Sequence, residues 1–180
     1  MNPADSALLV IDVQEKLVPH IADGEKMVWN IDRLIDATSL LEIPLVATEQ
    51  YPKGLGHTIE PLAGKIESCA EKAVFSCREC EFVFDELASR GVRKILVAGI
   101  ETHVCVMQTV LDLMSQGFEL YLAVDAVGSR FDLDHQMALR RMESSGATLT
   151  TTESAIFEWC ETSRNPAFKS ISQIIQRTFS

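Results

Sequence analysis

Cys105 is the residue of this sequence whose type and position most directly indicate chemistry. It lies in residues 99–106 (GIETHVCV), after an apolar run at 95–98 that predicts a strand buried on both faces. Thr102 is a suitable N-cap for a following helix that Gly117 would end. At the start of a helix, unpaired backbone N–H groups and the helix dipole favour a thiolate. Cys105 is therefore a candidate nucleophile, and the alternative is a small buried hydrophobic residue.

Asp12 and Lys72 are candidate partners for this thiol. Asp12 closes the apolar run at residues 7–12, where a carboxylate can act as a base or cap a turn. Lys72 stands directly before the apolar run at 73–76, where an ammonium group can stabilise a thiolate or remain a solvated flanking charge. The chemical interpretation therefore depends on whether the fold brings the three residues together.

Apolar runs and helical periodicity alternate along the chain. The predicted strands cover residues 7–12, 44–48, 73–76, 94–98, 119–124 and 147–151. The predicted helices cover residues 26–42, 79–90, 102–117, 132–145, 155–159 and 168–179, and residues 61–71 are loosely helical. This alternation indicates right-handed crossovers and a parallel sheet covered on both faces, the α/β class. Ligands bind such sheets beyond the carboxyl ends of the strands, where Asp12 and Cys105 would face one crevice if their strands are neighbours.

Composition and charge exclude some classes of protein. Of the 180 residues, 47% are hydrophobic and 23% are charged, which is typical of a globular domain. Sixteen basic and 26 acidic residues give a formal charge of −10, which argues against binding nucleic acid or an anionic membrane. No apolar run approaches membrane-spanning length, and the amino terminus lacks the basic region of a signal peptide.

The cysteines point to a reducing compartment. There are five, an odd number, in a sequence without a secretion signal, so we expect reduced thiols and a cytoplasmic protein. Cys77 and Cys80 form a C-x-x-C pair, a spacing found in redox and metal motifs. No second pair follows at zinc-ribbon spacing and no Trp-Cys-Gly-Pro-type context surrounds the pair. A thiol-redox protein is therefore an alternative with little support.

Three motifs, taken in order, resemble one known family. IDVQ at Asp12, EKAVFS at Lys72 and GIETHVCV at Cys105 resemble the isochorismatase-like cysteine hydrolase superfamily, over residues 8–151. The loop TEQYPKGLG is similar to that of the metal-free isochorismatase-domain subgroup. The resemblance implies one domain over residues 1–180, a three-layer α/β/α sandwich with a six-stranded, mainly parallel sheet of Rossmann-type topology. It also implies a homo-oligomer, since relatives form dimers, tetramers or octamers.

The same resemblance implies a role for each residue. Cys105 would attack a carbonyl carbon and form a thioester intermediate. Asp12 would take the thiol proton and return it to a leaving amine, while Lys72 would hold both groups in their working ionisation states. Family members carry a non-proline cis peptide at the position of Ile100–Glu101, and the backbone N–H groups of Glu101 and Cys105 would form an oxyanion hole. The implied activity is hydrolysis of a C–N bond in a small-molecule carboxamide or ureide.

Departures from the family pattern bear on the substrate. Nicotinamidases of this superfamily place an Asp-x-His and a later His after the second strand to hold a metal. Residues 48–57 (TEQYPKGLGH) keep one carboxylate and one histidine without that spacing, so we expect no metal and no cofactor. Isochorismatases cleave a vinyl ether by acid catalysis and lack the cysteine, so Cys105 favours acyl chemistry. A vinyl-ether hydrolase and a non-catalytic binding or scaffold protein remain the alternatives.

Other residues near the motifs are candidates for the pocket wall. His103 precedes Cys105 by two residues, and residues i and i+2 of a helix do not face each other. This spacing favours a pocket-rim or subunit-interface histidine over a catalytic base. The substrate-binding candidates are Leu17, Gln50, Tyr51 and Phe75.

Overall fold

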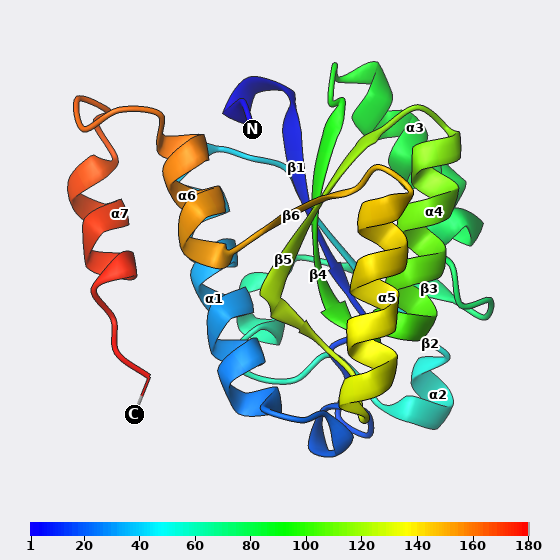
Figure 1. The fold of residues 1–180 in the computed structure, drawn as a ribbon. Helices are drawn as coiled ribbons and strands as arrows, with labels where there is room; N and C mark the ends of the chain where they lie inside the picture. Colours follow the sequence, from blue (N-terminus) through cyan, green and yellow to red (C-terminus); the bar gives the residue numbers. More distant parts are fainter. Residues whose placement is uncertain (180) are drawn as a thin grey trace.

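The computed structural model describes residues 1–179, and a six-stranded sheet lies at its centre (Figure 1). The strands are β1 (Ser6–Ile11), β2 (Leu45–Gln50), β3 (Cys69–Lys72), β4 (Lys94–Ile100), β5 (Glu119–Gly128) and β6 (Thr148–Thr150). Every neighbouring pair is parallel, and the order across the sheet is β3-β2-β1-β4-β5-β6. The predicted α/β class with a parallel sheet is confirmed.

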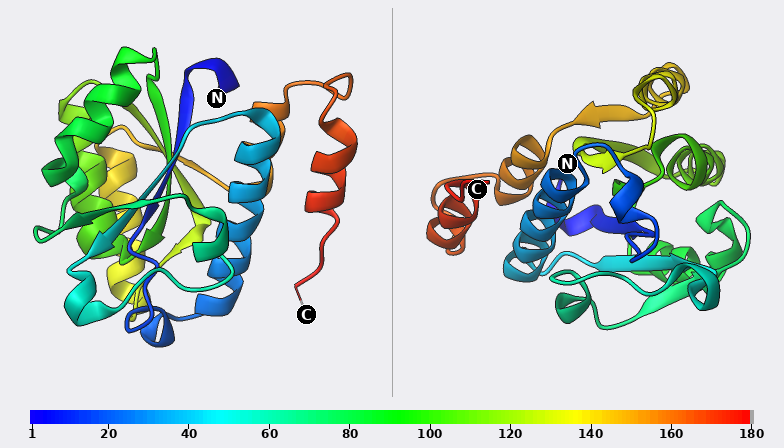
Figure 2. Two further views of the ribbon diagram at one scale, coloured as in Figure 1. Left: turned by 180° about the vertical axis from the view of Figure 1, so that it is seen from behind. Right: turned by 90° about the horizontal axis from the view of Figure 1, so that it is seen from below.

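Helices cover both faces of the sheet (Figure 2). The α-helices are α1 (Gly24–Leu41), α2 (Pro52–Leu55), α3 (Glu81–Ser89), α4 (Met107–Ser115), α5 (Asp132–Ser144), α6 (Thr152–Cys160) and α7 (Phe168–Ile175). Shorter helical turns are Pro3–Asp5, Val18–His20, Ala63–Lys65, Cys77–Cys80 and, with a π-helical pattern, Thr102–Val106. α1 and α6 cover one face, with α7 packed on their outer side, and α3, α4 and α5 cover the other face. Within residues 1–179, none of the helices is both long and apolar enough to cross a membrane.

The two helical layers explain the unbroken apolar runs of the central strands. Leu8 and Val10 of β1 pack into the hydrophobic cluster on the α1 side, whereas Leu9 and Ile11 pack into the cluster on the α4 side. Side chains alternate across a strand, so a strand covered on both faces needs apolar residues at every position. β4 follows the same rule and is buried from Ile95 onward.

The third strand lies earlier in the chain than predicted. The apolar run at 73–76 predicts a strand there, but β3 ends at Lys72. Beyond it, the Glu79 carboxylate accepts hydrogen bonds from the N–H groups of the next two residues, which holds them in a turn. β3 is an edge strand whose first three residues are not buried, so it lacks an apolar pattern. Lys72 therefore terminates a strand instead of preceding one.

The strand order reverses at β1, and this places three strand ends side by side. Ile11 of β1 is in register with Thr48 of β2 on one side and with Gly99 of β4 on the other. Gly99 has a φ of +117°, and a Cβ at this position would lie 2.1 Å from the backbone oxygen of Ile11. Only glycine tolerates that approach. The residues that follow these strands thus share one edge of the sheet, at the bottom of Figure 1.

Candidate active site

The structure brings Asp12, Lys72 and Cys105 together at this edge. Asp12 follows β1, Lys72 ends β3, and Cys105 lies in the π-helical turn after β4. Lys72 Nζ is 2.6 Å from Asp12 Oδ2, although β2 separates their strands, and both side chains are fully buried. Cys105 is 6% exposed, and the charges of both other residues act on its thiol. A thiol, a carboxylate and an ammonium group therefore form one buried cluster.

The Asp12 carboxylate is held through both of its oxygens. Lys72 donates to Oδ2, and the Thr48 hydroxyl donates to Oδ1 at 2.8 Å. The backbone supports the same position: Asp12 has a φ of +54°, and its N–H donates to the carbonyl of Thr48 at 3.1 Å. A left-handed residue at the end of a strand turns the side chain out of the strand's alternation. The carboxylate therefore has a fixed place beside the cysteine turn.

Lys72 uses all three of its donors inside the protein. Its ammonium group donates to Asp12 Oδ2, to Gln50 Oε1 at 2.7 Å and to the carbonyl of Phe75 at 2.9 Å. Burial lowers the pKa of Lys72, but the charges of Asp12 and of the thiolate forms of Cys105 and Cys77 raise it more. The net shift is upward, so Lys72 is a permanent cation in this site.

Gln50 and Gln14 support that cation. Gln50 Nε2 donates to the carbonyl of Ala73 at 2.6 Å, which aims Gln50 Oε1 at Lys72. The Gln14 side chain accepts from the Gln50 N–H at 2.7 Å and donates to the Gln50 carbonyl at 3.0 Å. The substrate-binding candidate Gln50 thus faces the cluster of Asp12, Lys72 and Cys105.

Sequence reasoning missed Gln14 and Thr48 as parts of the site. The signals available were that Gln14 ends the IDVQ motif and that Thr48 closes the apolar run of the second strand. Neither signal indicated which group the side chain of Gln14 or Thr48 would hydrogen-bond.

The ionisation state of Cys105 differs from the sequence-based expectation. Burial is the main cause that raises the pKa of the thiol, to about 12, and the negative charge of Asp12 raises it further. Lys72 acts in the opposite direction and is outweighed. The raised pKa favours a resting thiol at Cys105 over the predicted thiolate, so that a base would have to remove its proton during an attack.

The backbone before Cys105 forms a tight turn. The Ile100–Glu101 peptide bond is cis. The Glu101 carbonyl accepts from the N–H groups of Val104 and Val106 at 3.0 and 3.2 Å. The Glu101 side chain is held by Arg130, whose backbone N and Nε each donate at 3.1 Å. This turn presents Cys105 and the backbone of Glu101 on the side of Asp12.

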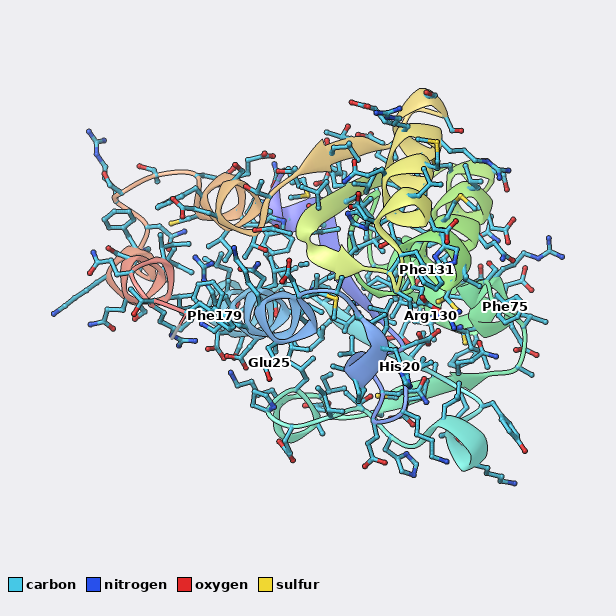
Figure 3. All side chains as sticks on the ribbon, turned by 60° about the horizontal axis from the view of Figure 1, so that its bottom comes forward. His20, Glu25, Phe75, Arg130, Phe131 and Phe179 are labelled. Carbon is cyan, nitrogen blue, oxygen red and sulfur yellow. The ribbon has the colours of Figure 1, made fainter. Side chains whose placement is uncertain are left out.

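The other three substrate-binding candidates are Tyr51, Phe75 and Leu17. Tyr51 and Phe75 are exposed, and Phe75 lines a surface cavity of about 560 Å³. Leu17 is half-buried against the α1-side cluster. Figure 3 shows Phe75, Arg130, Phe131 and His20 around the carboxyl end of the sheet.

The histidines of the cysteine turn and of α5 bind hydroxyl groups instead of the thiol. His103 Nδ1 is 3.0 Å from Ser129 Oγ, so His103 is engaged with the end of β5. His135 Nδ1 is 3.0 Å from the hydroxyl of Thr102, the first residue of the cysteine turn. Sequence reasoning did not single out His135.

Glu49 of β2 pairs with His57, which lies in the segment between β2 and β3. Glu49 Oε1 accepts from the N–H and the hydroxyl of Thr58 at 2.7 and 2.8 Å, and Glu49 Oε2 is 3.0 Å from His57 Nδ1. Burial raises the pKa of Glu49, but these hydrogen bonds lower it more, and the net shift is downward. The hydrogen bond to Glu49 raises the pKa of His57. Glu49 and His57 are thus hydrogen-bond partners of each other.

The C-x-x-C cysteines lie in the helical turn Cys77–Cys80, and both are buried and free. The Cys77 Sγ is 3.6 Å from the Thr48 hydroxyl, which in turn donates to the Asp12 carboxylate. Cys80 Sγ is 3.8 Å from the carbonyl of Glu71. The two side chains have different neighbours.

Comparisons with known proteins identify the family and the fold of this chain. The family described as "Isochorismatase domain" matches residues 6–154. Isochorismatase domain-containing protein 1 of Danio rerio is 36% identical over 98% of this chain, which spans only 62% of that relative's length. The structure of MAR1 ribonuclease from Caenorhabditis elegans is 39% identical, with a TM-score of 0.93 over 99% of this chain and 93% of that one. The Escherichia coli YcaC structure, described as an octameric hydrolase of unknown specificity, shares the fold at 22% identity, with a TM-score of 0.89 over 97% of this chain and 88% of that one.

Proposed function

This chain belongs to the isochorismatase family of hydrolases, and from that premise we propose that it cleaves a C–N bond in a small-molecule carboxamide or ureide. The observation that carries the proposal is the fully buried Asp12–Lys72 ion pair beside the Cys105 thiol. Burying an ion pair costs desolvation free energy. Charged groups buried beside a nucleophile are typical of catalytic sites.

The proposed reaction begins when Cys105 Sγ attacks the carbonyl carbon and Asp12 takes the thiol proton. The backbone N–H groups of Glu101 and Cys105 stabilise the oxyanion. Asp12 gives the proton to the leaving nitrogen, the C–N bond breaks, and a thioester remains on Cys105. Asp12 then takes a proton from water as the water attacks the thioester, and the acid product leaves as Cys105 regains its proton. Lys72 remains protonated throughout.

The raised pKa of Cys105 supports base-assisted attack over a preformed thiolate. A thiol that stays protonated at rest is also protected from side reactions until a carbonyl group is bound. Cys105 distinguishes this proposal from vinyl-ether cleavage, which requires an acid and no nucleophile. A scaffold protein with the same fold would not need a thiol, a carboxylate and an ammonium group in one buried cluster.

A second candidate is RNA cleavage, because the Caenorhabditis elegans structure is described as a ribonuclease. The formal charge of −10 argues against a phosphate-binding surface. We therefore rank single-stranded RNA below the amides and include it as the second substrate to test.

We also propose a cytoplasmic homo-oligomer. Large apolar side chains are exposed around the carboxyl end of the sheet, where a second copy could cover them; these are Tyr51, Phe75, Phe131, Leu133 and Met137. The five cysteines are free, which suits a reducing compartment. Light scattering on the purified chain measures the number of subunits.

The test is ammonia or amine release from a panel of carboxamides and ureides. We expect Cys105→Ala and Asp12→Asn to lower turnover about a thousandfold or more. Cys160→Ala, a buried cysteine on α6, is the matched control and should retain activity. Intact mass of the protein mixed with substrate should show an acyl adduct on wild type and none on Cys105→Ala. Turnover that survives both substitutions would exclude the mechanism, and Cys105-dependent cleavage of RNA would support the second candidate.

A further inference from the structure

The hydrogen bond between Thr48 and Asp12 has a defined direction. Thr48 is 1% exposed on β2, and its hydroxyl donates its only proton to Asp12 Oδ1 at 2.8 Å. The second contact of the same hydroxyl, at 3.6 Å to Cys77 Sγ, must therefore be one in which the thiol donates. The result is a chain of donors that runs from the Cys77 S–H through the Thr48 O–H to the carboxylate.

The ionisation and placement of Cys77 agree with this direction. Burial and the charge of Asp12 raise the pKa of the Cys77 thiol to about 11, so it keeps the proton that it donates. The Cys77 N–H donates to the Thr109 hydroxyl at 2.9 Å. Thr109 lies four residues after Cys105 on the adjoining helix, so the helix that carries the nucleophile also places Cys77.

We propose that Thr48 is a positioning residue for Asp12 and that Cys77 holds the Thr48 hydroxyl in the orientation this requires. The inference rests on the proposed function, in which Asp12 is the base. With Lys72 on one oxygen and Thr48 on the other, the carboxylate cannot rotate about its Cβ–Cγ bond. A free oxygen lone pair then stays directed at the Cys105 thiol.

The same hydrogen bond favours the form of Asp12 that the reaction needs. A donor to an ionised carboxylate stabilises the ion against protonation. Without the Thr48 hydroxyl, Oδ1 would be buried without this partner, and the carboxylate could turn away from the Cys105 thiol. The rate of Cys105 attack would then fall, and a serine at position 48, which keeps the hydroxyl, would restore it.

The experiment measures the rate of Cys105 alkylation by iodoacetamide at neutral pH, followed by peptide mass spectrometry, in wild type, Thr48→Val and Thr48→Ser. Valine preserves the shape and the strand preference of threonine and removes only the hydroxyl. We expect Thr48→Val to lower the rate about tenfold, since a hydrogen bond to a charged group has about this effect. Thr48→Ser should restore the wild-type rate. Thr38→Val removes another buried hydroxyl, on α1, and should leave the rate unchanged.

Two further measurements separate this inference from the proposed function. Alkylation needs no substrate, so it tests Thr48 even if no amide is turned over. On an active amide, Thr48→Val should lower kcat about tenfold with KM unchanged. If Thr48→Val does not fold, Cys77→Ala should lower the alkylation rate by a smaller factor. A Thr48→Val protein that is alkylated at the wild-type rate would overturn the inference, as would Cys77→Ala at the wild-type rate where it serves as the test.

Discussion

Removing the charge of Lys72 should destabilise the protein far more than removing both partners of the ion pair. Lys72 and Asp12 have side chains with no exposed surface and are joined at 2.6 Å. Replacing Lys72 with Met preserves the length of the side chain but leaves Asp12 as a buried, unpaired carboxylate. Breaking a buried pair in this way costs about 3–5 kcal/mol. In a protein of this size that corresponds to a fall in Tm of about 6–20 °C.

The double substitution supplies the control. In Asp12→Asn with Lys72→Met the site holds no buried charge, and the stability should return to within about 2 kcal/mol of wild type. Urea denaturation of wild type, both single variants and the double variant gives the coupling free energy directly. A Lys72→Met protein that unfolds within about 2 °C of wild type would refute the reasoning. So would a double variant whose loss of stability equals the sum of the two single losses.

Three other substitutions test features outside the ion pair. Glu49 raises the pKa of His57. The stability that this pair contributes is therefore fully present below the ordinary histidine pKa and is lost as pH rises through the pKa of His57 in the folded protein. The Tm of wild type should exceed that of His57→Gln near pH 6, and the two Tm values should converge in mild alkali. Gly99→Ala should destabilise by several kcal/mol in urea titrations, because its Cβ would lie 2.1 Å from the backbone oxygen of Ile11. Gly117→Ala, which has a positive φ and no atom within 4 Å of the new Cβ, should lose only about 1–3 kcal/mol. Equal losses at the two glycines would show that the close contact is unimportant.

The sequence was sufficient for those parts of the fold that depend on burial. β1 and β4 lie under helices on both faces, so their apolar runs predict them and place Asp12 and Cys105 on one edge. β3 has one strand neighbour and exposed residues, and for that reason its sequence Cys-Ala-Glu-Lys carries no strand signal. The Lys72 side chain reaches Asp12 across β2 because of the order of the strands in the sheet, which the periodicity of the sequence does not encode.

The hydrogen bonds inside the site were beyond sequence reasoning for a different reason. Thr48 and Gln14 each contact a group 36 residues away along the chain. Such contacts depend on register and side-chain rotamer, which no local pattern reports. The charge state of Cys105 likewise depends on how deeply three elements bury it, and that balance reversed the expectation from the helix start alone.

The position of Lys72 on an edge strand has a consequence for how activity is lost. β3 contains four residues and pairs only with β2, so its hydrogen bonds can open while the rest of the sheet remains intact. When β3 opens, the ammonium group leaves the site and the carboxylate of Asp12 is left unpaired. Protection of β3 from hydrogen exchange and the proposed turnover should therefore be lost together, at temperatures below global unfolding. The proposed activity thus depends on the local stability of a four-residue edge strand.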